Sequence, residues 1–161
     1  MNDIVISDTT ALIILAKSDT FSLLSNLFQK IYIPQAVYDE LMFKDDIVNY
    51  RIKAFNSIEV KPVSDIATLE RIKTLKIDKG EVEAISLALE LNLMLIIDER
   101  KGRKIALNQG LKIVGVLGIL IENYRQSFLT LDEVKLNFLL LKEQGLRVSE
   151  QLEKIFFERL A

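Results

Sequence analysis

The sequence predicts an α/β fold in three layers, with helices on both faces of a mostly parallel sheet of four to five strands. Short runs of β-branched and aliphatic residues alternate along the chain with longer segments whose apolar residues recur at helical spacing. The strand-like runs are apolar throughout, which is typical of strands buried on both faces of a parallel sheet. The 161 residues suffice for one compact domain with a substantial core. We expect the α/β domain to span residues 1–125, with residues 126–161 forming a C-terminal pair of helices packed on it.

Strands and helices alternate through the first part of the chain. The run Asp3–Ser7 predicts a buried strand, and the apolar segment Ala11–Lys17 predicts a buried helix. A strand at Ile31–Ile33 leads to Pro34, which suits the first turn of a helix that ends at Lys44. The remaining expected elements here are a helix at Phe21–Phe28, a helix after the polar stretch Lys44–Arg51 and a strand at Ile58–Val60.

The second part repeats this alternation and then becomes helical. Leu93–Ile97 is the clearest strand, and it separates a helix that follows Gly80 from a basic helix closed by Gly110. Thr130 and Glu133 match a capping box at the start of a later helix. The other expected elements are helices at Ser64–Leu75 and Gly115–Tyr124, a strand at Lys112–Val114 and a last helix capped by Ser149.

Histidine and cysteine are both absent from the chain. Their absence excludes disulfides, thiolate catalysis, a Ser-His-Asp triad and zinc sites built on imidazole or thiolate ligands. Any hydrolytic chemistry must therefore use carboxylates, lysines, hydroxyls or a hard metal ion.

Charge and hydropathy indicate the cellular compartment and the kinds of partner to expect. Its apolar runs are shorter than the roughly 18–20 residues of a membrane span, and the segment MNDIVISD lacks the basic and apolar regions of a secretory signal. We therefore expect a cytoplasmic protein with no membrane partner. The net charge of −2 does not by itself indicate nucleic-acid binding, which would need a local basic patch.

Two aspartates directly follow apolar strands. Asp8 ends the first predicted strand and Asp98 ends Leu93–Ile97. The carboxyl ends of parallel strands meet at one edge of a sheet, where ligands collect, so both carboxylates should lie there. An aspartate after a strand can instead simply cap the next helix, and for a single such aspartate that reading is preferred.

Two glutamates on predicted helices extend this acidic set. Glu81 lies in the first turn of its helix and leads a buried stripe that continues at Ile85 and Ala88, whereas Glu83 points elsewhere. Glu40 borders the apolar face of its own helix. Taken alone, either glutamate fits an ordinary helix position with no role in a site.

A convergence of these four carboxylates would require a cation. Without one they would repel each other and raise each other's pKa values. Oxygen ligands suit Mg²⁺ or Mn²⁺. Such ions can bind phosphate oxygens and activate water, so that no nucleophilic side chain is needed.

The motifs and their order resemble those of PIN domains, the PilT N-terminus-like nuclease fold. The matching segments are VISDTTALIILAK, VYDEL, KGEVEAISLALE and LIIDERKGRKIA, and the resemblance covers roughly residues 3–121. It is nearest to a PIN-like branch whose third motif reads Gly-Glu-x-Glu-Ala. The resemblance implies a PIN-like nuclease domain at 1–125, a site for Mg²⁺ or Mn²⁺ and cleavage of single-stranded RNA, often by the toxin of a toxin–antitoxin pair.

The resemblance also assigns roles to individual residues. The catalytic and metal-binding acids of the family correspond here to Asp8, Glu40, Glu81 and Asp98. Thr10 matches the small hydroxyl residue that accompanies the first acid, and Glu99 is a supporting residue beside the fourth. Arg100, Lys101 and Arg103 could bind substrate phosphates. They fit a solvated helix face equally well, although Arg103 matches a recurrent arginine of the family.

These acidic and basic residues are compatible with three functions to different degrees. The first is a divalent-metal-dependent endoribonuclease, with an antitoxin protein as a possible partner. The second is a catalytically weak or inactive PIN-like module that binds nucleic acid or regulates. A phosphoryl-transfer domain of the receiver or haloacid-dehalogenase type fits poorly, because the first strand ends in Asp8-Thr9-Thr10 without the paired acids of those families. The apolar helices LNFLLLKE and KIFFERLA favour a homodimer.

Overall fold

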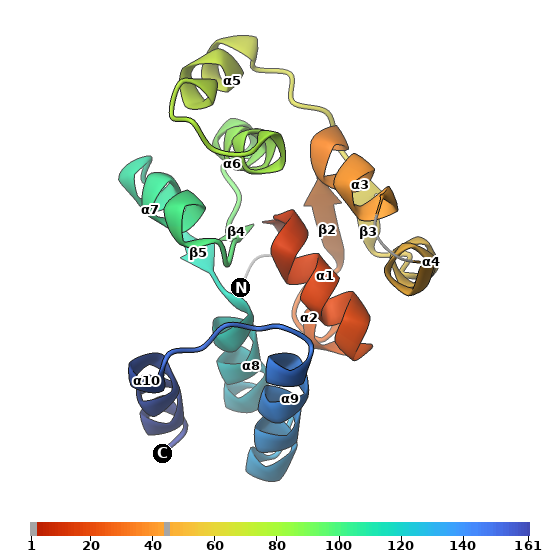
Figure 1. The fold of residues 1–161 in the computed structure, drawn as a ribbon, viewed down its shortest axis with the longest axis vertical. Coiled ribbons are helices and arrows are strands. Elements are labelled where there is room, and N and C mark those ends of the chain that lie inside the picture. Colours follow the sequence, from red (N-terminus) through yellow and green to blue (C-terminus); the bar gives the residue numbers. More distant parts are fainter. Residues whose placement is uncertain (1–2, 44–45) are drawn as a thin grey trace.

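A computed structural model, which describes residues 3–43 and 46–161, shows an α/β fold around a five-stranded parallel sheet (Figure 1). The strands are β1 (Ile4–Ser7), β2 (Lys30–Ile33), β3 (Ile58–Val60), β4 (Leu95–Ile96) and β5 (Ile113–Val114). They lie side by side in the order β3-β2-β1-β4-β5. The predicted fold class is confirmed.

Ten helices surround this sheet in the described ranges. They are α1 (Thr9–Ser18), α2 (Ser22–Ser25), α3 (Gln35–Met42), α4 (Asp46–Ala54), α5 (Ile66–Lys73), α6 (Lys79–Leu91), α7 (Arg100–Asn108), α8 (Val116–Arg125), α9 (Leu131–Glu143) and α10 (Glu150–Leu160). Figure 1 shows α8, α9 and α10 grouped at one end of the molecule and α5 and α6 at the other. The predicted end of α3 at Lys44 lies outside the described residues. Within those residues, every helix is too short or too polar to span a bilayer.

The strand order places β1 at the centre of the sheet. The chain adds β2 and β3 on one side of β1 and then crosses to add β4 and β5 on the other. Ile6 pairs with Leu95 and Ser7 with Ile96, so the carboxyl ends of β1 and β4 are neighbours. In an open α/β sheet, this point where the strand order reverses is where ligands bind.

The central strands are buried on both faces, as their apolar composition predicts. Val5, Ile31 and Leu95 are fully buried. Strand β4 has only two residues. Its ladder nevertheless extends further, because Ile6 N donates to Met94 O and Ile97 N donates to Val114 O, both at 3.0 Å. The predicted strand Leu93–Ile97 therefore corresponds closely to the segment that is hydrogen-bonded.

The predicted helix Phe21–Phe28 is shorter than expected. Helix α2 has a single turn, Ser22–Ser25. A last helical hydrogen bond runs from Phe28 N to Leu24 O at 2.8 Å, and the N–H groups of Gln29 and Lys30 then both donate to Asp3 O, at 2.8 and 3.2 Å, where β2 begins beside β1.

The two C-terminal helices share the core of the sheet domain. Phe138 of α9 and Phe156 of α10 stack with ring centroids 5.0 Å apart, and both belong to the same buried apolar cluster as the strands. The predicted capping box at Thr130 and Glu133 is present at the start of α9, and Ser149 caps α10. The packing agrees with a helical pair docked on the domain, and the division at residue 125 stays a prediction.

Asn123 connects α8 to the segment around α2. Its side chain is fully buried, and its Nδ2 donates to Leu23 O at 3.0 Å and to Ile119 O at 2.8 Å. Its Oδ1 accepts a hydrogen bond from Asn26 Nδ2 at 2.9 Å. Because these hydrogen bonds converge on one buried side chain, this asparagine fixes the relative position of two elements far apart in the sequence.

We predict that Asn123→Ala lowers the free energy of unfolding by about 1–3 kcal/mol, because it leaves buried polar groups without partners. Denaturant titration measures this change. Asn108→Ala is the control, since Asn108 is exposed at the end of α7, and it should alter stability by less than about 0.5 kcal/mol. Equal stabilities for the two variants would show that the Asn123 network is dispensable.

Candidate active site

Asp8 and Asp98 lie next to each other where the strand order reverses. Asp8 directly follows β1, and Asp98 comes two residues after the end of β4. The neighbouring strand ends bring the two residues close enough for the backbone N–H of Asp98 to donate to Asp8 Oδ2 at 3.0 Å. This is the edge of the sheet at which the sequence predicts both aspartates.

The Asp8 carboxylate has two structural partners. It is only 2% exposed. Its Oδ1 accepts a hydrogen bond from Ala11 N at 3.0 Å and so caps α1, while its Oδ2 accepts from Asp98 N. Asp8 therefore caps a helix and also lies in the acidic site, so the two readings of its position are compatible.

Asp98 precedes α7, but its carboxylate is hydrogen-bonded to the start of α8. Its Oδ2 accepts a hydrogen bond from Val116 N at 3.0 Å, at the start of α8. The cap of α7 is instead Glu99, whose Oε2 accepts from Gly102 N at 2.6 Å. Helix capping of α7 thus does not account for Asp98, whereas it does account for Glu99.

Glu81 and Glu99 face each other between α6 and α7. Their side chains share a hydrogen bond. Helix α7 approaches Glu81 at Gly102, where a Cβ atom would lie 2.9 Å from Glu81 Oε2. The missing side chain of Gly102 thus leaves room for the Glu81 carboxylate.

Glu40 reaches the site from α3, which packs on α6. Its carboxylate lies directly against Gly80, where an added Cβ would overlap Glu40 Oε1. Glu83 fixes the start of α3, because its Oε1 accepts a hydrogen bond from Ala36 N at 3.1 Å. The sequence predicts only that Glu83 points away from Glu81, and this contact between two helices was missed.

The hydroxyl residue beside Asp8 that faces the site is Thr9. Its side chain is buried, and its Oγ1 lies 3.3 Å from the position that a Cβ on Gly80 would occupy. Thr10 is exposed and accepts or donates no side-chain hydrogen bond within the described residues. No local pattern distinguishes the two threonines in the sequence, because the choice depends on the approach of Gly80 from another helix.

The four acids are coupled electrostatically, with Asp8 at the centre. Burial raises the pKa of Asp8 from 3.8 to about 7, against its backbone hydrogen bonds and with the help of the charges on Asp98 and Glu40. The pKa of Glu81 is raised from 4.5 to about 8. Burial is the largest cause, the charge and hydrogen bond of Glu99 come next, and the charge of Asp8 makes a smaller contribution. Asp8 therefore interacts with each of the other three acids.

The pKa values of Asp98 and of the neighbouring Glu99 shift in opposite directions. The pKa of Asp98 is raised, mainly by burial, although Arg103 opposes the shift. Burial acts to raise the pKa of Glu99 as well, but the N–H groups of Gly102 and Lys101 and the hydrogen bond with Glu81 hold it below its ordinary value. Glu81 and Glu99 thus behave as a protonated acid that donates to a carboxylate.

The acids share one site without forming a finished ligand set. Among residues 3–43 and 46–161, no three carboxylates are arranged so as to hold a metal ion. Two of the acids have other partners: both oxygens of Asp8 accept backbone hydrogen bonds, and Glu81 is paired with Glu99. The donor set contains only oxygen, which fits Mg²⁺ or Mn²⁺ chemically. Metal binding by these four acids stays a prediction.

The three predicted phosphate-binding residues lie in different surroundings. Arg103 is at the site, where its Nη1 donates to Ile97 O at 2.7 Å and its charge acts on Asp98. Lys101 Nζ donates to Lys76 O at 2.9 Å. Arg100 is exposed and has no side-chain partner in the described part of the chain. The structure therefore brings Arg103 to Asp98, while the charge of Lys101 acts on the neighbouring Glu99.

Fold and site together define an α/β protein with a carboxylate cluster at the reversal point of a parallel sheet. A family model described as a PIN domain matches residues 4–160, and the chain belongs to the PIN domain family. Proteins of this family are generally nucleases. The match includes all of α9 and α10, beyond the roughly 3–121 covered by the motifs.

Solved structures support the same fold. The chain is similar to a chain of the VapBC2 complex from Rickettsia felis, which was solved bound to a DNA fragment from its promoter. The TM-score is 0.55 at 17% sequence identity, over 70% of this chain and 98% of that chain. No curated protein matches the sequence.

We predict that the metal-free protein loses stability as pH rises from about 5 to 8. Because the pKa of Asp8 is raised from 3.8 to about 7, the folded state holds a proton that the unfolded state releases. This contribution is fully present below pH 3.8 and is lost once the pH has risen through about 7, at up to about 1.4 kcal/mol per pH unit. Glu81 acts in the same direction up to about pH 8.

Denaturant titration across this range in EDTA measures the slope. Asp8→Asn should make it shallower, whereas Asp39→Asn, which changes an exposed carboxyl on α3, should leave it as in the unmodified chain. A slope that Asp8→Asn does not alter would contradict the prediction.

Proposed function

We propose that this chain is a divalent-metal-dependent endoribonuclease that cleaves single-stranded RNA. The observation that carries the proposal is the position of Asp8 within electrostatic reach of Glu40, Glu81 and Asp98, at the reversal point of the sheet. The chain has neither histidine nor cysteine to offer another hydrolytic centre. The PIN domain family supports nuclease chemistry at such a site.

The four acids would hold Mg²⁺ or Mn²⁺. When bound, such an ion supplies Lewis acidity toward a phosphodiester and lowers the pKa of water. Asp8 and Asp98 provide fixed carboxylates, since backbone N–H groups orient both, and each oxygen keeps a lone pair for a further ligand. Glu40 and Glu81 reach in from helices. Arg103 beside Asp98 could contact a substrate phosphate.

We also propose that the chain is the toxin of a toxin–antitoxin pair that acts in the cytoplasm, with an antitoxin protein as partner. The fold similarity to the VapBC2 complex supports this partner. A homodimer is supported by Leu136 and Leu139 on α9, which are 68% and 59% exposed. Light scattering of the purified chain tests the dimer, for which the mass should be twice 18.4 kDa. A monomeric mass would reject it.

We predict that Asp8→Asn and Glu40→Gln each reduce cleavage of single-stranded RNA in Mn²⁺ by about 100-fold or more, because each removes a carboxylate needed for the ion. A gel assay with labelled RNA measures the rates, and EDTA should abolish cleavage by the unmodified protein. Asp39→Asn is the matched control, because it changes the exposed neighbour of Glu40 on the same helix. Cleavage that persists in EDTA, or in Asp8→Asn, would overturn the proposal.

The second candidate function is a PIN-like module that binds nucleic acid or regulates without efficient catalysis. The observation in its favour is that, in the described residues, the acids do not form a ready set of metal ligands. The two candidates differ in whether the site takes up a divalent ion.

We predict that Mn²⁺ at about a hundred times its dissociation constant stabilises the protein by about 2.7 kcal/mol. For a domain of this size, that corresponds to a rise in melting temperature of roughly 5–10 °C. Asp8→Asn should show no rise. A melting temperature that Mn²⁺ leaves unchanged in the unmodified protein would favour the second function over the first.

A further inference from the structure

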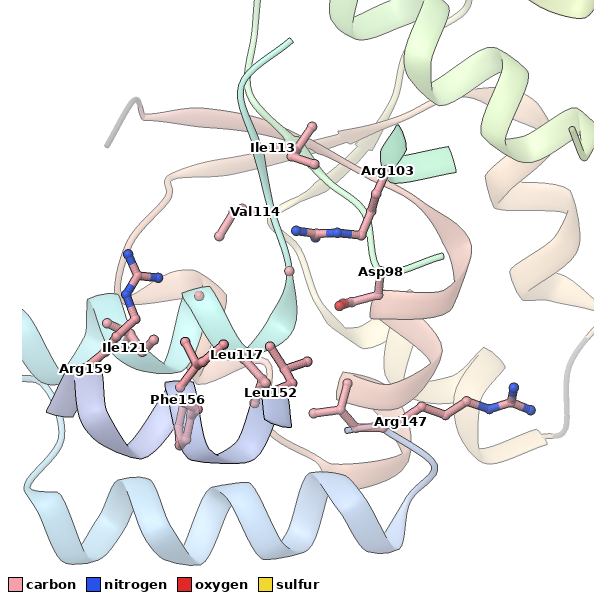
Figure 2. Close-up of a pocket in the computed structure, with 14 residues that line it drawn as sticks. Asp98, Arg103, Ile113, Val114, Leu117, Ile121, Arg147, Leu152, Phe156 and Arg159 are labelled. Carbon is pink, nitrogen blue, oxygen red and sulfur yellow. The ribbon is translucent and has the colours of Figure 1, made fainter. Parts of the chain in front are cut away.

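A groove opens beside Asp98, between the β5–α8 segment and α10 (Figure 2). It encloses about 370 Å³. Leu117 and Ile121 of α8 line one side and Leu152 and Phe156 of α10 line the other. Because α10 provides one side, the groove exists only where the C-terminal helices are docked on the sheet domain.

Three arginines line this apolar groove. Arg103 lies with Asp98 where the groove meets the acids, and Figure 2 shows Arg147 and Arg159 toward opposite ends of α10. Arg147 precedes α10 and Arg159 belongs to its last turn. The lining therefore carries three positive charges and, at Asp98, one carboxylate.

Arg147 and Arg159 are not used to hold the fold. Both side chains are exposed, and neither forms an ion pair or a side-chain hydrogen bond within residues 3–43 and 46–161. An exposed arginine usually contributes little to stability even when it is paired. Two unpaired guanidinium groups at one apolar groove are thus available to a ligand.

We propose that this groove binds the phosphodiester backbone of a single strand next to the cleavage site, with Arg147 and Arg159 contacting phosphates. The proposal rests on the proposed function, because the strand enters the groove from the acids at Asp98. Guanidinium groups match phosphate oxygens in geometry and charge. The apolar sides offer contact to a sugar or base, and the volume is of the size expected for a small ligand group such as one nucleotide.

Charge favours a phosphodiester strand over a protein segment in the groove. Under the proposed function the scissile phosphate already lies at the acids, so the next phosphates of the same strand pass the arginines without any further requirement. A peptide would need carboxylates placed at the arginines and a cationic side chain placed at Asp98, whereas a strand needs only its repeating phosphates and the metal ion of the proposed function. Binding of a protein alone is therefore an outcome that the experiment can reveal and that would reject the proposal.

The experiment compares binding of a fluorescein-labelled single-stranded RNA in EDTA, so that cleavage does not interfere. For Arg147→Gln/Arg159→Gln we expect the dissociation constant to rise by about tenfold or more. The slope of log Kd against log salt concentration should fall by about 1.4, at about 0.7 for each lost phosphate contact. Unchanged affinity and slope would overturn the proposal, as would the absence of RNA binding by the unmodified chain.

The matched control is Lys135→Gln/Lys154→Gln. It removes the same charge from α9 and α10, and both lysines are exposed and outside the groove lining. Its affinity should stay within about twofold of the unmodified chain, because distant exposed charges are screened by salt. A loss equal to that of the arginine variant would mean that net charge, and not the groove, determines binding, and would overturn the proposal.

A second pair of variants tests the groove without removing an arginine. Leu152→Glu places a negative charge in the lining, whereas Gln151→Glu places the same charge on the neighbouring exposed position outside it. Only Leu152→Glu should weaken RNA binding. Equal effects of the two variants would reject the groove as the binding surface.

The affinity for single-stranded DNA of the same sequence shows whether the groove recognises the phosphodiester backbone alone or also the ribose of RNA. Equal affinities identify the shared backbone as the recognised group, and tighter RNA binding adds a contact to the 2′-hydroxyl; both agree with the proposal. Failure of the proposed function is seen separately, as absent cleavage in Mn²⁺ by a protein whose RNA affinity still depends on Arg147 and Arg159.

Discussion

The two hydrogen bonds that Asp8 accepts hold the site together. One comes from Ala11 at the start of α1 and the other from Asp98 beyond β4, so a single carboxylate joins the central strand, its helix and the neighbouring strand. Strand β4 is short. The hydrogen bond from Asp98 N to Asp8 Oδ2 keeps the chain after β4 attached to the end of β1, beyond the last backbone pair of the two strands. Burial raises the pKa of the carboxyl that makes it. The same side chain is therefore a structural bridge and a carboxyl whose ionised form is disfavoured by burial.

Around this bridge, three glycines leave the space that the other acids occupy. A Cβ at Gly80 would overlap the Glu40 carboxylate, one at Gly102 would crowd Glu81, and one at Gly115 would lie 2.7 Å from Asp98 Oδ1. Each glycine lies on a different element from the acid that it faces. Close approach of the backbone, and not turn conformation, thus explains why these positions carry no side chain.

Local pattern was sufficient to predict most of the fold and the two aspartates. Strand–helix alternation, the capping box at Thr130 and the placement of Asp8 and Asp98 all depend on residues close in sequence, and all agree with the structure. Contacts between distant elements were not predictable in this way. The hydrogen bonds from Gln29 and Lys30 to Asp3 join β2 to the start of β1, and the contact of Glu83 with α3 joins residues 47 positions apart.

The same limit applies to the details of the site. The sequence could not show that Thr9 faces Gly80 while Thr10 is exposed, since this choice depends on the packing of α3 and α6 around α1. Nor could it show the pairing of Glu81 with Glu99, which occurs across two helices. Arg147 and Arg159 carried no sequence signal, because the groove that they line forms only when α10 docks beside α8.

The backbone contacts of the two aspartates have an evolutionary consequence. Folding alone selects for Asp8 and Asp98, because both accept hydrogen bonds from main-chain N–H groups. Glu40 and Glu81 accept none from the main chain of the described residues, and Glu81 has only a side-chain hydrogen bond with Glu99, so metal binding or catalysis is the main constraint that would preserve them. In a lineage that lost the activity, the glutamates would drift first while the aspartates persisted. The residues at the two glutamate positions, and not those at the aspartate positions, thus distinguish an active enzyme from an inactive homologue.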